Sequence, residues 1–144
     1  MSVAAALALT AAIVAVAIAG GLVVRAQDGR RRSGGHLAFR PEDLGGRSLA
    51  PSATLVQFST ELCARCPQVR RLLGQIADEN ADVEHVEVDL TNRNDLATRY
   101  HVLQTPTTFL VDASGVVLSR WGGVPHRNTI QDALALALHP QEQK

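Results

Sequence analysis

The chain is poor in cysteine and in aromatic residues, and it has no excess of charge of either sign. Two cysteines in 144 residues are too few to staple a small secreted fold through several disulfides. Aromatic residues make up 3% of the chain, so a core has to be built mainly from Val, Leu, Ile and Ala. The formal net charge of +0 gives no support to a nucleic-acid-binding surface. What remains is a length that suits one small domain and an additional segment.

That additional segment is the N-terminal stretch 2–24, which contains no charged side chain and is mostly Ala, Val, Leu and Ile. As a helix rising about 1.5 Å per residue, it is long enough to cross a bilayer core of about 30 Å. A cleaved signal peptide is an alternative, with Ala17-Ile18-Ala19 as its cleavage site, but no Lys or Arg precedes the apolar run. A buried helix of a soluble protein is a second alternative. The sequence favours a single-pass membrane anchor over residues 1–24.

The residues after the anchor set its expected orientation. A group of basic residues follows it closely: Arg25, Arg30, Arg31 and Arg32. By the positive-inside rule they predict a cytoplasmic C-terminal domain, with an extracytoplasmic domain as the alternative. We interpret them as a flank that touches anionic lipid headgroups, not as a nucleic-acid site.

Residues 25–53 are rich in Gly, Pro and Arg and are expected to form a basic tether. Within it, the segment 37–44 could form a short strand or turn against the domain, with Phe39 and Leu44 as its apolar contacts.

From Thr54 onward the pattern predicts an α/β domain over residues 54–144, with the order strand, helix, strand, helix, strand, strand, helix. Alternation over the first three strands predicts parallel pairing, and the last strand adds an antiparallel edge on which Trp121 would pack. Thr91 or Asn92 is the expected cap of the second helix. The expected strands are 54–58, 83–89, 107–112 and 116–120, and the expected helices run from near Cys63 to near Asn80, from Asn92 to Tyr100, and over 130–138.

The two cysteines, Cys63 and Cys66, lie two residues apart where the first predicted strand gives way to a helix. At a helix N-terminus the partial positive charge favours a thiolate, and Arg65 would add to this effect. Cys63 is therefore the expected nucleophile, and Cys66 the thiol that resolves the mixed disulfide. Two alternatives stay open: a static disulfide or inert thiols, and a zinc site completed by histidines from His85, His101 or His126.

The residues from Thr54 to Leu138 resemble a thioredoxin-fold domain. The likeness rests on Cys63-x-x-Cys66 after a buried strand, a strand that ends at Asp89, Thr105-Pro106-Thr107, and the Asp112-x-x-Gly115 hairpin followed by Gly122-Gly123. It implies a mixed sheet with helices on both faces and a cis peptide bond between Thr105 and Pro106, packed beside the cysteine pair. It also implies that this loop offers its backbone to an extended substrate segment.

Several positions depart from the thioredoxin pattern. Leu62 replaces the usual Trp before the first cysteine, and Ala64-Arg65 replaces Gly-Pro. Gln57 stands where thioredoxins keep a buried Asp that relays a proton, and His85 stands where the Lys partner of that Asp would be. Because Gln cannot titrate, the proton has to come from water, from His85 or from a carboxylate such as Glu61. His85 could equally be an ordinary sheet histidine with a hydrogen-bond partner.

The resemblance and the apolar stretch together predict a membrane-tethered thiol–disulfide oxidoreductase. Its expected partners are protein thiols or disulfides, an unidentified reductant or oxidant, and the lipid bilayer, with no nucleic acid. The redox-active pair Cys63–Cys66 would serve in place of a cofactor, and no metal is expected. The alternative is a redox-silent binding module that docks on a membrane partner.

Overall fold

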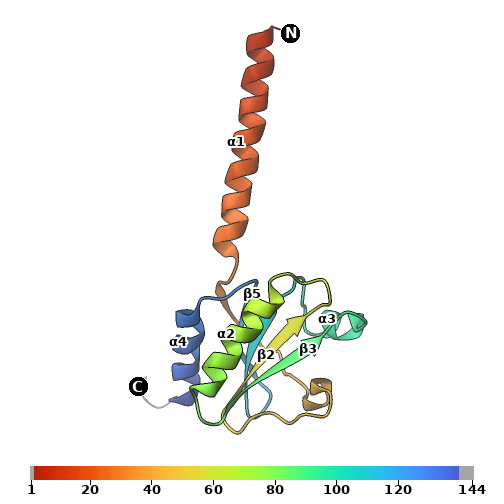
Figure 1. Ribbon diagram of the computed structural model, residues 1–144, viewed down its shortest axis with the longest axis vertical. Coiled ribbons are helices and arrows are strands. Elements are labelled where there is room, and N and C mark those ends of the chain that lie inside the picture. Colours follow the sequence, from red (N-terminus) through yellow and green to blue (C-terminus); the bar gives the residue numbers. More distant parts are fainter. Residues whose placement is uncertain (1, 140–144) are drawn as a thin grey trace.

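The computed structural model describes residues 2–139, and its first helix projects away from the folded domain (Figure 1). This helix, α1 (Val3–Gln27), has no buried residue, and Ser2 caps it by accepting a hydrogen bond from the Ala5 amide at 3.3 Å. It is long and apolar enough to cross a membrane, although a signal sequence would share these properties. Met1, at the start of the predicted anchor, and residues 140–144, at the end of the predicted domain, lie outside the described part of the chain.

A five-stranded mixed sheet forms the centre of the domain, with strand order β1-β5-β4-β2-β3. The strands are β1 (Arg31–Ser33), β2 (Ala53–Ser59), β3 (Val83–Asp89), β4 (Thr107–Asp112) and β5 (Val117–Gly122). Only β2 and β3 pair in parallel, and the other neighbours are antiparallel. The predicted mixed sheet is thus confirmed, whereas the predicted parallel pairing of the third strand, β4, is wrong.

The connection between β3 and β4 explains the direction of β4. The helix in this connection, α3 (Asn94–Arg99), has 6 residues and is about 9 Å long. The 7 residues of β3 extend over about 23 Å. Since the helix is too short to carry the chain back along the strand, β4 starts at the same end of the sheet at which β3 finishes.

Two apolar layers sandwich the sheet, as alternation along its strands requires. One face packs against α2 (Cys66–Asp78) and α4 (Arg127–Leu138), which lie side by side in Figure 1. The other face packs against α3 and the short 3-10 helix η1 (Pro41–Leu44). Within β2, Val56 and Phe58 point to the second face, whereas Leu55 points to the first. Gln57 therefore points toward α2 as well.

The segment that follows α1 contributes to the domain. Its residues Arg31–Ser33 form β1, which pairs with β5 and places Arg31 opposite Trp121. Sequence patterning gave no sign of this strand because its three residues are polar. Phe39 and Leu44 are buried in the core, in agreement with the contacts predicted for them. Trp121 is fully buried; the predicted edge position is wrong because β1 covers β5.

Helix starts are the other point of disagreement. The first helix of the domain, α2, begins at Cys66 and not near Cys63. Neither Thr91 nor Asn92 caps α3: the N-cap is Arg93, which makes no capping hydrogen bond through its side chain. Thr91 is instead engaged by Asp89, whose Oδ1 accepts from the Thr91 amide at 2.9 Å. A local turn therefore competes successfully for the residue that would otherwise cap the helix.

Candidate functional site

A disulfide joins Cys63 and Cys66 in the turn between β2 and α2. Their Sγ atoms are 2.04 Å apart and their Cα atoms 5.4 Å apart. The turn is closed by the Cys63 amide, which donates to the Thr60 carbonyl at 3.1 Å, and by the Cys66 amide, which donates to the Cys63 carbonyl at 3.3 Å. Cys66 is 2% exposed, whereas Cys63 is partly exposed. Of the two sulfur atoms, that of Cys63 is the one an external thiol can reach.

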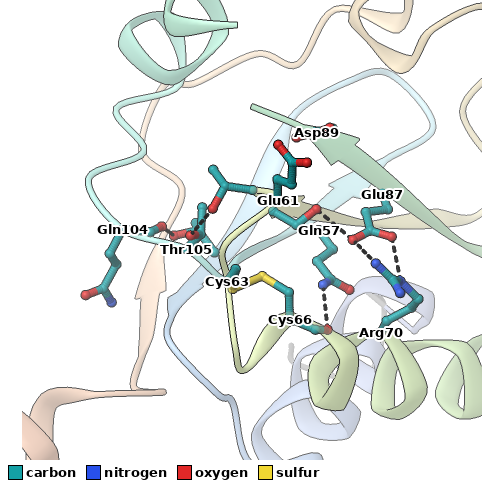
Figure 2. The surroundings of a disulfide bond; sticks show 12 residues. Gln57, Glu61, Cys63, Cys66, Arg70, Glu87, Asp89, Gln104 and Thr105 are labelled. Carbon is teal, nitrogen blue, oxygen red and sulfur yellow. Dashed lines mark hydrogen bonds and ion pairs between the residues drawn. A yellow bond between two sulfur atoms is a disulfide. The ribbon is translucent and has the colours of Figure 1, made fainter. Parts of the chain in front are cut away.

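The loop before β4 lies beside the disulfide. The Thr105–Pro106 peptide bond is cis, as predicted. Thr105 Oγ1 and Thr60 Oγ1 are 3.1 Å apart and hydrogen bonded, and Figure 2 shows Thr105 next to Cys63. Pro106 is buried, and its carbonyl accepts from the Gly123 amide at 2.8 Å. This leaves Thr105 as the residue of the loop that lies toward the disulfide.

Gln57 connects the second cysteine to His85 on β3, and Figure 2 shows its contact with Cys66. Its side chain is fully buried, and its Nε2 donates to the Cys66 carbonyl at 3.0 Å. Its Oε1 lies 3.1 Å from His85 Nε2, so the histidine nitrogen is the donor of that bond. Burial lowers the pKa of His85 against the opposing effect of the nearby Glu87 carboxylate, and the charges of Arg70 and Arg47 also lower it. His85 is therefore neutral near pH 7, with its Nε2 proton held by Gln57.

A second polar cluster, which the sequence did not single out, lines a hollow beside the disulfide. Glu87 Oε2 accepts from Arg70 Nε at 2.6 Å, and its Oε1 accepts from Ser59 Oγ at 2.6 Å. The hydrogen bond from Arg70, together with that from Ser59, lowers the pKa of Glu87 against the opposing effect of burial. Alternation along β3 puts Glu87 on the same face as His85, and this was the available signal. The hollow is also lined by the disulfide itself and by Glu61 and Asp89.

Comparison with known proteins turns this geometry into a family assignment. The thioredoxin family model matches residues 48–135, which is more than half of the chain. The chain belongs to the thioredoxin family. Thiol–disulfide exchange by a cysteine pair is the general chemistry that this membership and the Cys63–Cys66 disulfide support.

Individual relatives agree with the thioredoxin assignment. The chain is 30% identical over 77 residues to thioredoxin C-2 of Corynebacterium nephridii, a match that covers 53% of this chain and 71% of that protein. A mutant thioredoxin from Halobacterium salinarum superposes with a TM-score of 0.55 at 20% identity, over 60% of this chain and 75% of that one. Thioredoxin from Fasciola hepatica gives 0.53 at 20% identity, over 61% and 83%. The two structures show the fold alone.

Arg65, which stands between the two cysteines of this thioredoxin site, is held by a residue from outside the predicted domain. Its Nη1 lies 2.5 Å from Asp28 Oδ2, in an ion pair whose side chains are 53% and 24% exposed. Asp28 is the residue that immediately follows α1. The positive charge expected to act on the thiolate is therefore partly compensated. Sequence reasoning missed Asp28 because 37 positions separate it from Arg65.

The residues predicted from the sequence belong to two sets: those of the redox site and the histidines of the zinc alternative. Around the disulfide the structure brings together Thr105, Pro106, Gln57 and, through Gln57, His85. Within residues 2–139, no group of three or more His, Cys, Asp or Glu side chains is arranged to hold a metal ion. His101 and His126, named for the zinc alternative, lie on loops after α3 and before α4.

Proposed function

We propose that this protein is a membrane-tethered thiol–disulfide oxidoreductase that acts on protein substrates. The observation that carries the proposal is the disulfide of a partly exposed Cys63 with a buried Cys66, beside the cis-Pro loop of a thioredoxin-family domain. The difference in exposure supports the two roles that we assign, in which Cys63 attacks and Cys66 resolves. Thr105 is the proposed contact for the backbone of the substrate.

The exchange balances without a cofactor. In the reducing direction, the Cys63 thiolate attacks one sulfur of a substrate disulfide, and the other substrate sulfur leaves as a thiolate. The Cys66 thiolate then attacks Cys63 Sγ, which breaks the mixed disulfide and releases the second substrate thiolate. The substrate gains two electrons, takes up two protons and becomes a dithiol, while the protein becomes the disulfide seen here. The oxidising direction is the reverse, and a second protein dithiol or disulfide resets the pair.

Proton transfer from the buried Cys66 thiol, or to it in the reverse direction, needs a route that avoids Gln57, since an amide does not titrate. His85 contacts the far side of the same amide, 3.1 Å from Gln57 Oε1, so the Gln57 side chain separates it from Cys66. Glu61 lines the hollow next to the sulfurs. In the reducing direction the Cys66 thiol must lose its proton before it attacks, and we assign the proton acceptor to water or Glu61 in this hollow. We assign to His85 and Gln57 a role in positioning the start of α2. Arg65 is assigned a modulating effect on the thiolate.

The membrane part of the proposal rests on α1 and on the arginines that follow it. We propose that α1 spans the bilayer once and that the domain lies on the cytoplasmic side, as the basic flank predicts. Reporter fusions at the N-terminus and after residue 139 test this orientation. A C-terminal reporter active only outside the cytoplasm would reverse it and would assign the protein to the oxidation or repair of exported proteins.

Turnover of a protein disulfide tests the activity. The full chain in lipid nanodiscs, supplied with a chemical reductant, should accelerate the reduction of insulin disulfides. Cys63→Ser should abolish the acceleration. Cys66→Ser should instead accumulate a mixed disulfide through Cys63, visible as a mass shift that reductant reverses. Ala64→Ser in the same turn is the matched control and should retain turnover. Wild-type protein that binds insulin without turnover, with Cys63 open to alkylation, would favour the redox-silent binding module.

A further inference from the structure

The end of the N-terminal helix is seated against the redox turn. Asp28 pairs with Arg65 between the two cysteines, and its Oδ1 accepts a hydrogen bond at 3.5 Å from the side-chain Nε2 of Gln104, the residue before Thr105. One side chain therefore touches both halves of the proposed site, the cysteine turn and the cis-Pro loop. Its own backbone amide still caps α1, donating to the Val24 carbonyl at 3.1 Å. We call this set of contacts the clasp: Asp28, Gly29, Arg65, Gln104 and Gly123.

Two glycines make the close approach of the clasp possible. A Cβ on Gly123 would lie 1.9 Å from Asp28 Oδ1, and a Cβ on Gly29 would lie 2.3 Å from the Val124 carbonyl oxygen. Both residues also have a positive φ, at +79° and +73°, which residues other than glycine rarely adopt. The Gly29 amide donates to the Gly122 carbonyl at 2.6 Å. The helix end and the domain thus fit together at backbone distance.

Almost no slack remains between the helix and the sheet. The helix ends at Gln27, and β1 starts at Arg31 and pairs with β5 through Ser33. The three residues between them include two members of the clasp. A flexible linker would let the domain tumble below its anchor, whereas this connection fixes one end of the domain toward the helix. In Figure 1 the start of α2 lies at the same end of the domain as the end of α1.

Charge along α1 sets the depth of that end relative to lipid. The last residue of the uncharged stretch is Val24, and Asp28 follows four residues later. Four residues of helix correspond to about 6 Å, a distance within the headgroup layer of a bilayer. A hollow beside the clasp is lined by Arg30, Arg32 and Arg120, a charge that suits the anionic lipid surface. Leu62 and Leu103, which flank the two halves of the site, are each 95% exposed.

We propose that the redox site faces the bilayer and that its exchange partner is a membrane protein whose cysteine pair lies at the lipid surface. This inference rests on the proposed oxidoreductase function and names its substrate class. The clasp holds Cys63 close to the headgroups, so a membrane protein with a disulfide at the lipid surface can reach Cys63 by diffusing within the membrane. The two exposed leucines then contact an apolar surface of the partner at the same level.

The reach of lipid-anchored probes tests the proposal. A peptide carrying one internal disulfide is coupled to a phospholipid headgroup through a linker of either four or forty residues. Four residues span at most about 14 Å, and forty flexible residues have a typical reach of about 35 Å. A domain of this size is itself about 35 Å across. The short probe can therefore reach a site at the membrane-facing end of the domain but none at the opposite end.

The measurement compares reduction of both probes and of soluble insulin by the full chain in nanodiscs. We expect the short probe to react about tenfold or more faster than the long one, because effective concentration falls with about the 3/2 power of linker length. The control variant carries a twenty-residue Gly/Ser spacer between Val24 and Arg25. The spacer removes the hydrogen bond from the Asp28 amide to the Val24 carbonyl and frees the domain from the helix, but it keeps the five residues of the clasp and β1 in the domain. Its preference for the short probe should fall toward one, with insulin reduction unchanged.

Each other outcome decides against the proposal in a distinct way. Reaction with the long probe alone would mean that the site faces away from the bilayer. Equal preference in wild type and in the spacer variant would mean that the helix does not orient the domain. Insulin reduction without reaction of either lipid probe would overturn the membrane-surface partner and leave the oxidoreductase function standing. Failure with insulin as well would remove the proposed function itself.

Discussion

Replacing Asp28 with Asn should make the Cys63–Cys66 couple more oxidising. In the disulfide form neither sulfur is charged, whereas in the dithiol form the Cys63 thiolate carries negative charge in part of the molecules. The Asp28 carboxylate, bound to Arg65 between the cysteines, opposes that charge and cancels part of the Arg65 charge. Asn keeps the size of the side chain and removes only the charge. The dithiol form is then stabilised relative to the disulfide, and the reduction potential rises.

The exposure of the ion pair limits the size of this effect. The Arg65 and Asp28 side chains are 53% and 24% exposed, so solvent screens their influence. Exposed pairs of this kind contribute about 0.2–1 kcal/mol. For a two-electron couple about 1.4 kcal/mol corresponds to 30 mV, so we expect a rise of about 5–20 mV. Arg65→Ala should lower the potential by a similar amount, and the double variant should return close to the wild-type value.

Equilibration of the full chain in nanodiscs against glutathione buffers measures these potentials, with alkylation of free thiols scored by mass. Asp132→Asn on α4 and Arg71→Ala on α2 change the same charges at exposed positions away from the turn and should leave the potential unchanged. The shifts should shrink at high salt, because screening shortens the range of the charges. A fall in potential for Asp28→Asn, or a rise for Arg65→Ala, would refute this account of the site.

Two further predictions concern stability, measured by urea unfolding. Tyr100 donates to Asp43 Oδ2 at 2.5 Å and accepts from the Arg40 amide at 3.1 Å. Tyr100→Phe removes both hydrogen bonds and should reduce the free energy of unfolding by about 1–3 kcal/mol. A loss below about 0.5 kcal/mol would contradict a stabilising role for these two bonds. Burial lowers the pKa of His85, so the unfolded state binds the extra proton once pH falls below about 6.5. The free energy of unfolding should therefore decrease as the pH falls from 7.5 to 5, by at most about 1.4 kcal/mol per pH unit. His85→Gln should flatten that slope, and an equal slope in both proteins would show that His85 is not the titrating group.

Local signals in the sequence were sufficient for most of the fold. The apolar run and the short spacing of Cys63 and Cys66 predicted a strand, a turn and a helix, and the structure has all three, with the helix starting three residues later. The cis bond before Pro106 followed from resemblance to a family and is present. The direction of β4 did not follow, because alternation of strands and helices says nothing about a helix too short to cross the sheet.

What the sequence by itself determined is the chemistry: two thiols at the spacing of a redox pair, a proline loop, and an apolar N-terminal stretch followed by arginines. Periodicity, spacing and charge are local properties, and the order of the residues is enough to show them. Only the tertiary structure decided which distant groups meet. It paired β1 with β5 at Trp121, hydrogen-bonded Gln57 to His85, and paired the charges of Asp28 and Arg65. Such contacts depend on the folded path of the chain, so Asp28, which the sequence assigns to a tether, contacts the redox site.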